Sequence, residues 1–313
     1  MDLFNETKEN NATNGTTTEE MEEHLLVDLI LPMLTWTLMG IAEILFAALV
    51  IVAIVKAREL RRMQYFFIAN LMICDIGSSI TVNFLVTCTV INSLINENSK
   101  GVSCKAIDFL YFPFTASFLM VTVVIFDRFL HIKEPFRYRE IMTKKLAVAL
   151  VALSWIIAML LCLFSLFDPQ HQGQYTRNGF CSTTTLLSRV LAIILPNTVA
   201  TAFAVALVIW MVWKAQKAAN YGQSQQGYVI NRKALMTLIL LAGTAGLLGV
   251  LVPILLGVTR LTVGNETVSA RFVQNVIVPI FGKAPTMAHA LLYGFHLTEI
   301  RKNILKMIKC CKN

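Results

Sequence analysis

Seven long stretches of apolar residues, separated by short polar connections, dominate the chain. They lie around 29–55, 65–92, 106–130, 146–167, 186–213, 234–258 and 272–295. A helix that crosses a bilayer needs about 20 successive apolar residues, and each stretch is long enough. The pattern therefore predicts seven membrane-spanning helices. The longest connections lie near 168–185 and 214–233, so we expect no separate soluble domain between the spans.

Composition supports a membrane protein. Hydrophobic residues make up 56% of the chain and charged residues 15%, and the mean hydropathy is +0.64. A soluble domain carries about 25% charged residues. The start of the chain is polar and acidic, unlike a cleavable secretory signal. We predict an all-α membrane protein with a disordered, glycosylated tail at 1–24, a seven-helix domain at 25–296, and an amphipathic eighth helix with a short tail at 297–313.

The distribution of basic residues predicts the orientation. Most of the 27 Lys and Arg residues lie in alternate connections and in the C-terminal segment. Basic segments face the cytoplasm, so the N-terminus is expected outside, in the plasma membrane. Anionic inner-leaflet lipid accounts for the net charge of +8 without a nucleic-acid partner. Four asparagines in glycosylation triplets all fall on the predicted outside: Asn5, Asn11, Asn14 and Asn265.

The seven cysteines fall into three groups. Three lie inside apolar spans, where we expect them to pack as small hydrophobes: Cys74, Cys88 and Cys162. Cys104 and Cys181 are both expected outside, where thiols oxidise, and a disulfide between them would tie the loop after span four over the bundle. Cys310 and Cys311 end a basic amphipathic stretch, a setting suited to palmitoylation.

Ionisable residues inside the spans are the strongest candidates for function, because charge at bilayer depth is costly. They are Glu43, Asp75, Asp127, Arg128, Lys283 and His289. Seven spans alone suit receptors and transporters equally, so these residues must separate the two classes.

At these positions the chain resembles the rhodopsin-like (class A) G-protein-coupled receptors. The residues that carry the resemblance are Asn70-Leu71, Asp75, Asp127-Arg128-Phe129, Pro253, Tyr293, Cys104 and Cys181. The resemblance implies a receptor that binds an extracellular ligand and activates a heterotrimeric G protein. It also implies the lipid bilayer, arrestin and a receptor kinase as partners.

Two further blocks suggest a neighbourhood within that class. The segment 60–75, and Asp127-Arg128-Phe129 followed by 135–138, look like odorant-receptor signatures. Gln226-Gly227-Tyr228, and Pro285 eight residues ahead of Tyr293, look like the orphan subfamily called probable G-protein coupled receptor 148. These resemblances imply a small organic ligand and a role in olfaction or another chemosensory process.

The resemblance assigns an inner-face switch to Asp127, Arg128, Phe129 and Tyr293. In the family, the Asp pairs with the Arg at rest, and the Arg turns to receive the G protein on activation. Here Phe129 keeps the aromatic ring of the family's Tyr and loses its hydroxyl.

The resemblance also assigns a polar core to Asp75, Ser117 and His289. In relatives, an Asn at the position of His289 joins the other two around a sodium ion that favours the inactive form. We hypothesise that a contact between Asp75 and His289 replaces sodium partly or wholly. The alternative is a neutral His289 bonded to backbone or water. Two further family residues are also replaced here, by Ala47 and Ala290.

Lys283 lies ten residues before Tyr293, the spacing at which the family's light receptors carry their retinal-binding lysine. A protonated Schiff base also needs a carboxylate counter-ion, but the usual span-three position falls on Ala106 or Ile107, and the nearby Asp108 matches neither count. We therefore expect no cofactor and keep a retinal-binding light receptor as the less favoured alternative.

The candidate ligand pocket comprises Asp108, Tyr111, Phe112 and Lys283. Lys283 is expected to recognise an acidic ligand, to pair with Asp108 or Glu43, or to face a water-filled cavity. Amine receptors place an Asp in span three where this chain has Leu110 or Tyr111, which disfavours a biogenic amine.

Other functional classes find less support. The sequence has no zinc-binding spacing, phosphate-binding loop or placeable Ser-His-Asp set, so we do not expect an enzyme. It also has no internal repeat of the kind expected in a transporter. A receptor-like protein with weak or no signalling remains an alternative, because Ala47, His289 and Ala290 replace three family residues.

Overall fold

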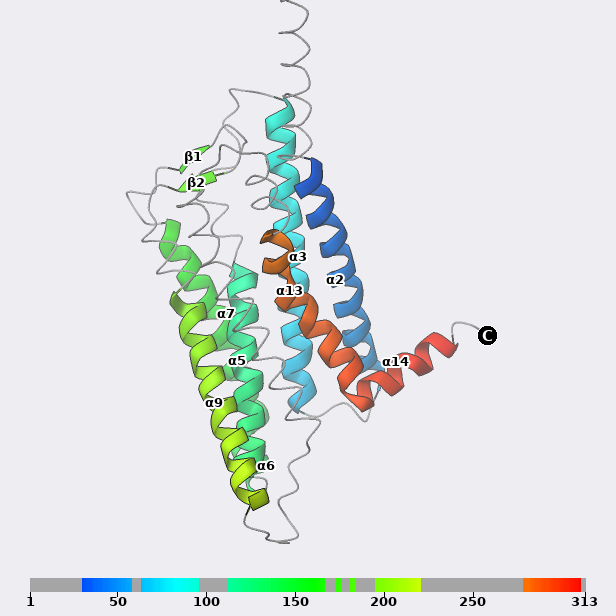
Figure 1. Cartoon of the computed structure of the whole chain (residues 1–313), viewed down its shortest axis with the longest axis vertical. Helices are drawn as coiled ribbons and strands as arrows, with labels where there is room; N and C mark the ends of the chain where they lie inside the picture. Colours follow the sequence, from blue (N-terminus) through cyan, green and yellow to red (C-terminus); the bar gives the residue numbers. More distant parts are fainter. Residues whose placement is uncertain are drawn as a thin grey trace, which may run out of the picture.

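The computed structural model describes residues 30–57, 63–95, 112–134, 136–166, 173–175, 181–183, 195–220 and 278–310. Long helices run side by side through these ranges (Figure 1). They are α2 (Leu31–Lys56), α3 (Met63–Ile95), α5 (Phe112–Lys133), α7 (Lys144–Leu166), α9 (Leu195–Asn220) and α13 (Val278–Leu291). They correspond to six of the seven predicted spans, and the span predicted at 234–258 lies outside the described residues.

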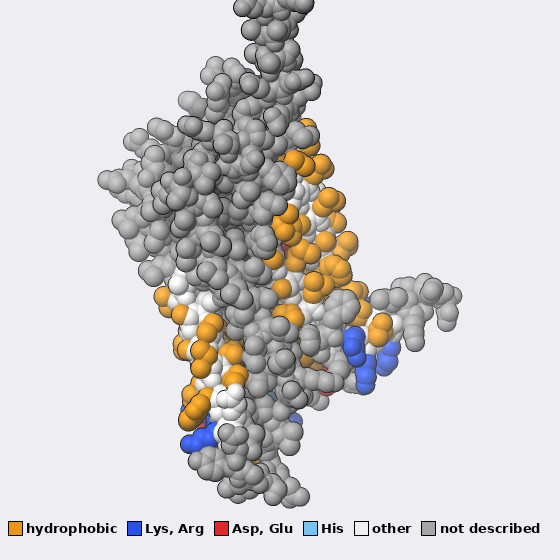
Figure 2. Space-filling view, viewed as in Figure 1, with side chains coloured by type: hydrophobic (Ala, Val, Ile, Leu, Met, Phe, Trp, Pro, Cys, Tyr) orange, Lys and Arg blue, Asp and Glu red, His pale blue; other side chains and the backbone are white. Residues whose placement is uncertain are grey.

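Four of these helices, α2, α3, α5 and α7, are long and apolar enough to cross a membrane. Their outer faces are also apolar. On α2, the side chains of Leu38 and Leu45 are 67% and 64% exposed, and hydrophobic side chains cover the visible faces of α2 and α9 (Figure 2). Large apolar surfaces are rare on soluble monomers and are expected where helices face lipid.

Helix α3 is the centre of the described bundle, since it packs against α2, α5, α7 and α13. Its contribution to the core is a fully buried apolar block formed by Phe67, Ile68, Leu71 and Met72. Met120 and Ile125 on α5 and Met211 on α9 extend this core. Small residues bring α2 close to its neighbours, because Ala47 and Ala53 are almost completely buried.

Gly40 on α2 faces the side chain of Asn83 on α3. A Cβ atom at this position would lie 1.9 Å from Nδ2 of Asn83, and that amide donates a 2.8 Å hydrogen bond to the carbonyl oxygen of Ser79. We expect Gly40→Ala to displace this amide and so to remove its hydrogen bond, which contributes about 0.5–1.5 kcal/mol to the stability of the protein. Thermal unfolding in detergent measures this, with Gly294→Ala as the control, because the nearest atom to a Cβ there is 3.4 Å away. Equal melting temperatures for the two variants would contradict the expectation.

One structural feature departs from the all-α prediction. Strand β1 (Gly173–Tyr175) pairs antiparallel with β2 (Cys181–Thr183) in the connection between α7 and α9. Strands of three residues are too short to show a period-two pattern, so the sequence did not predict this hairpin. It is the only sheet within the described residues.

The helix limits also differ from the apolar stretches. Helix α9 is described from Leu195, the residues directly before it lie outside the described part of the chain, and the helix continues past the predicted end at 213 to Asn220. Its added last turns contain Lys, Ala and Gln, which have high helix propensity. Hydropathy locates the part of a helix that lies in lipid, whereas the helix itself can continue beyond it.

The last helices change direction. Helix α13 ends in a π-helical segment, η6 (Leu292–His296), and Leu297 then takes an extended conformation. The next helix, α14 (Thr298–Cys310), leaves the bundle at a steep angle (Figure 1). Ile300 and Ile304 are buried on one side of α14, while its basic side chains are exposed: Arg301, Lys302 and Lys306.

Candidate functional site

A buried polar core joins α3, α5 and α13, and it contains the three residues that the sequence assigned to it. Ser117 Oγ donates a 2.5 Å hydrogen bond to Oδ1 of Asp75. Nδ1 of His289 lies 3.2 Å from Oδ2 of the same carboxylate. All three side chains are buried. Both carboxylate oxygens of Asp75 therefore have a partner from another helix.

A second buried pair links α13 to α2. Nζ of Lys283 lies 3.1 Å from Oε2 of Glu43. The same nitrogen is 3.1 Å from Oγ of Ser79 and 3.4 Å from Oγ of Ser78, and Ser79 also donates to Glu43. An ammonium has three hydrogens to donate, so three neighbouring oxygens can satisfy it completely. Among the interactions foreseen for Lys283, the structure contains the one with Glu43.

The serines of this cluster were not identified from the sequence. Ser78 and Ser79 follow Asp75 by three and four residues on α3, and side chains at these spacings share one face of a helix. That spacing was an available signal, but serines are common in membrane helices and pack there without a charged partner. Their role becomes visible only once Lys283 is placed beside them.

Several buried polar atoms in this region have no hydrogen-bond partner among the described residues. They are Oε1 of Glu43, Oδ1 of Asn83, Oγ1 of Thr115, Nε2 of His289 and the hydroxyl of Tyr293. Buried polar groups are normally hydrogen-bonded to protein or water. The polar core thus offers further bonding positions beyond those that its described residues fill.

The predicted inner switch lies at the end of α5. Nε of Arg128 is 3.8 Å from Oδ2 of Asp127, which is the pair that the resemblance implied. The closer partner is Gln64 on α3, whose Oε1 accepts a 2.6 Å hydrogen bond from Nη1 of Arg128. Arg128 is therefore attached to α3 more tightly than to its own neighbour.

Tyr138 is hydrogen-bonded to the Asp127 carboxylate oxygen that Arg128 does not approach. It lies in the short helix α6 (Tyr138–Ile141), in the connection after α5, and its hydroxyl donates a 2.5 Å hydrogen bond to Oδ1 of Asp127. Partial burial and this bond to a carboxylate raise the pKa of Tyr138 above its ordinary value. The phenol therefore stays protonated, and remains a donor, throughout the physiological pH range.

A further link joins α14 to the switch. The hydroxyl of Tyr65 donates a hydrogen bond to the carboxylate of Glu299, in the first turn of α14. Tyr65 follows Gln64 directly in the chain, so two adjacent residues of α3 hold Arg128 and Glu299. Gln64 and Tyr65 belong to the segment 60–75 that resembles odorant receptors, but the sequence did not identify either residue, or Glu299, as a partner of this region, because nothing in a sequence shows which side chains meet across helices.

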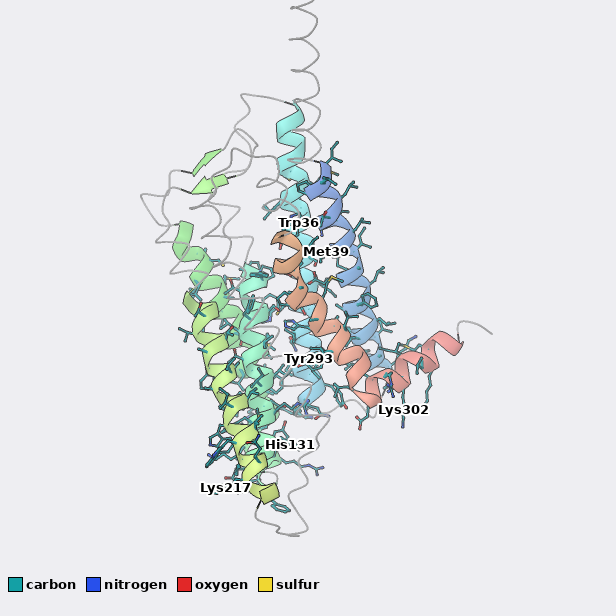
Figure 3. The ribbon with its side chains drawn as sticks, viewed as in Figure 1. Trp36, Met39, His131, Lys217, Tyr293 and Lys302 are labelled. Carbon is teal, nitrogen blue, oxygen red and sulfur yellow. The ribbon has the colours of Figure 1, made fainter. Side chains whose placement is uncertain are left out.

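Phe129 packs against α9 instead of presenting a hydroxyl. Its ring centroid lies 4.9 Å from that of Trp210 and 6.3 Å from that of Phe126. Tyr293, the last residue of the predicted switch, is buried within η6. It is labelled in Figure 3, and the labels of His131, Lys217 and Lys302 lie below it in that view.

The predicted ligand pocket is only partly described. Phe112 lies at the start of α5, with its ring 6.0 Å from that of Trp155 on α7, and Lys283 is in the polar core. Asp108 and Tyr111 lie outside the described residues, as do all four predicted glycosylation sites, Cys104, Cys311 and the tail at 1–24. Cys181 begins β2 and Cys310 ends α14, but their side chains are not described.

Comparison with known proteins gives a consistent result. The chain is 32% identical over 139 residues to olfactory receptor 10D3 of Mus musculus, a region that covers 43% of this chain and 41% of the relative. It is 30% identical over 160 residues to dopamine receptor 1 of Drosophila melanogaster, covering 50% of this chain and 31% of the relative. It is also 30% identical over 170 residues to olfactory receptor-like protein I9 of Rattus norvegicus, covering 53% of this chain and 52% of the relative. The matched regions thus span between a third and about half of these relatives.

The family assignment covers more of the chain. Residues 47–281 match the family described as 7 transmembrane receptor (rhodopsin family). This region includes α3, α5, α7 and α9 with the polar core's Asp75 and the switch residue Arg128. The predictions of a seven-helix receptor fold and of a receptor rather than an enzyme are confirmed. The chain is a multi-pass membrane protein that belongs to the rhodopsin family of seven-transmembrane receptors.

Proposed function

We propose that this receptor binds a small organic molecule at its outer side and activates a heterotrimeric G protein at its inner side. The observation that carries the proposal is the arrangement around Arg128. Its guanidinium is held by Gln64 and Asp127 at the end of α5, and Tyr138 in α6 binds the other side of Asp127. Breaking these few hydrogen bonds would release a cation at the inner surface without unfolding a helix.

The proposed orientation places the N-terminus outside the plasma membrane and α6 and α14 in the cytoplasm. The exposed Lys and Arg side chains visible in Figure 2 lie at the ends of α9 and α14, at the same end of the molecule as α6. This clustering agrees with the positive-inside rule. The proposal includes glycosylation of the N-terminal tail, the disulfide between Cys104 and Cys181, palmitoylation of Cys310 and Cys311, and later binding of a receptor kinase and arrestin.

The ligand class follows from two observations. Lys283 already contacts Glu43, Ser78 and Ser79, so an acidic ligand would have to displace an internal carboxylate to reach it. Two of the relatives described above are named as olfactory receptors. A small organic molecule held largely by apolar and aromatic contacts, in an odorant-like chemosensory role, therefore fits the chain better than an acid does.

Guanine-nucleotide exchange tests the proposed function. The receptor would be reconstituted in lipid bilayers with a panel of purified heterotrimeric G proteins and screened against a library of small organic compounds. We expect at least one compound to accelerate exchange in at least one G protein. A receptor that couples to none of them, with or without compounds, would support the alternative of a receptor-like protein that does not signal. Compound uptake into the vesicles would instead indicate a transporter.

Phe136 provides a specific test of the docking surface. Its ring is 90% exposed beside α6, so it is accessible to a partner that docks at this connection, and aromatic residues are enriched among those that carry binding energy in interfaces. We expect Phe136→Ala to reduce G-protein activation about tenfold without changing surface expression. Leu38→Ala, which alters an exposed apolar residue on the lipid-facing side of α2, is the control. Equal activation by the two variants would exclude this role.

A retinal-binding light receptor is the second candidate, favoured by one observation. Glu43, 3.1 Å from Nζ of Lys283, is a carboxylate of the kind that a protonated Schiff base needs. The nitrogen of Lys283, however, is already bound by three oxygens, and a Schiff base would have to break these contacts. We therefore expect 11-cis-retinal to give no new absorbance band with the purified protein. A band that Lys283→Ala removes would instead establish the light receptor.

A further inference from the structure

Each oxygen of the Asp75 carboxylate has a partner from another helix of this chain. Ser117 occupies Oδ1 from α5, and the imidazole of His289 occupies Oδ2 from α13. The Asp75 and His289 side chains are each no more than 1% exposed. An Asn in place of His289 would bring an oxygen to this position, whereas the imidazole brings a nitrogen that can donate a hydrogen.

This arrangement does not suit a sodium ion, which the family resemblance implies at Asp75. Hard cations bind through oxygen ligands, several at a time. Here the ring nitrogen of His289 lies 3.2 Å from the oxygen that the ion would need, so a cation would have to displace the imidazole to reach Oδ2. Ser117 brings a hydroxyl oxygen of the kind such a site uses, so the misfit lies at His289, which brings a nitrogen instead of an oxygen. The residues present therefore do not fit the ion.

We propose that His289 takes the place of the sodium ion, so that the resting state of this receptor is held by a direct contact between α13 and α3 and is insensitive to sodium. The contact binds the two helices that an ion would otherwise bridge. For its effect on signalling, the inference depends on the proposed function; for its effect on ion binding and stability, it does not.

The test compares the melting temperature of the purified, full-length protein in NaCl and in choline chloride at equal ionic strength. A bound ion stabilises the folded state by mass action. We expect the wild type to melt at the same temperature in both salts. A higher melting temperature in NaCl would overturn the proposal.

The variant His289→Asn supplies the missing oxygen. We expect it to gain a sodium-specific rise of about 2–4 °C at salt concentrations well above the Kd of the new site. This gain should vanish in the double variant Asp75→Asn, His289→Asn, which removes the carboxylate. If His289→Asn folds and remains indifferent to sodium, His289 is not what excludes the ion, and the proposal is wrong.

A second variant guards against a failure of His289→Asn to fold. His289→Ser places a smaller oxygen ligand at the same position, and we expect its melting temperature also to rise specifically in sodium. A folded His289→Ser variant that is indifferent to sodium would contradict the proposal. All these experiments measure how the melting temperature depends on the salt, and none of them measures signalling. A protein that fails to activate any G protein but shows this sodium pattern would contradict the proposed function alone.

Discussion

Replacing Glu43 with Ala is expected to lower the free energy of unfolding by about 3–5 kcal/mol, since removing one partner of a buried ion pair leaves the other charge uncompensated. The charge left behind is the ammonium of Lys283, which is 2% exposed and 3.1 Å from the Glu43 carboxylate in the intact protein. Ser78 and Ser79 remain as acceptors, but hydroxyls do not balance a full charge.

Paired variants separate the charge from the packing. The double variant Glu43→Leu, Lys283→Met removes both charges and keeps the volume, and we expect it to recover most of the lost stability, because apolar replacements of buried pairs are often neutral. Thermal and denaturant unfolding of the purified proteins measures the effect. If Glu43→Ala alone proves as stable as the double variant, the pair carries no net charge coupling, and this interpretation fails.

Replacing Arg128 with Ala is expected to reduce ligand-stimulated nucleotide exchange to the level seen without receptor. In the proposed mechanism, this guanidinium is the group that the G protein receives after its release. The measurement is exchange in bilayers at matched receptor density, with a thermal unfolding control to show that the variant is folded. Unchanged exchange would remove Arg128 from the switch.

Gln64→Ala should act in the opposite direction. It deletes the 2.6 Å hydrogen bond that holds Arg128 to α3, and the longer contact with Asp127 is then the one that remains among the described residues. A hydrogen bond to a charged group contributes about 1.5–3 kcal/mol, so we expect basal exchange without ligand to rise about tenfold or more. A variant with normal basal exchange would show that Gln64 does not restrain the switch.

The helices were predictable from the sequence because each follows from local composition. About 20 apolar residues in succession have few alternatives in a membrane, and the residues near Asp75 and Arg128 stand at spacings that a family resemblance can align. The pairing of Asp75 with His289 was accessible in the same way, as a carboxylate at depth demands a partner and His289 was the unusual residue opposite it.

The partner of Lys283 could not be predicted from the sequence. Its partner Glu43 lies 240 positions away in the chain, and the rotation of two helices about their axes decides whether they meet. Sequence reasoning left both Asp108 and Glu43 open, because hydropathy fixes the depth of a residue but not the direction in which it faces. The bond between Gln64 and Arg128 shows the same limit, and the β1–β2 hairpin is too short to leave a pattern.

The distribution of the two buried pairs has a consequence for biosynthesis. Both acids, Glu43 and Asp75, belong to the first two spans, whereas both basic partners, Lys283 and His289, belong to the last described span. At about 5–20 residues per second, the ribosome adds the residues between them over tens of seconds. During that time the nascent chain holds two carboxylates at bilayer depth without these partners. Insertion of span seven is therefore the step that brings both partners to these carboxylates, and a chain that stops short of it lacks both of them.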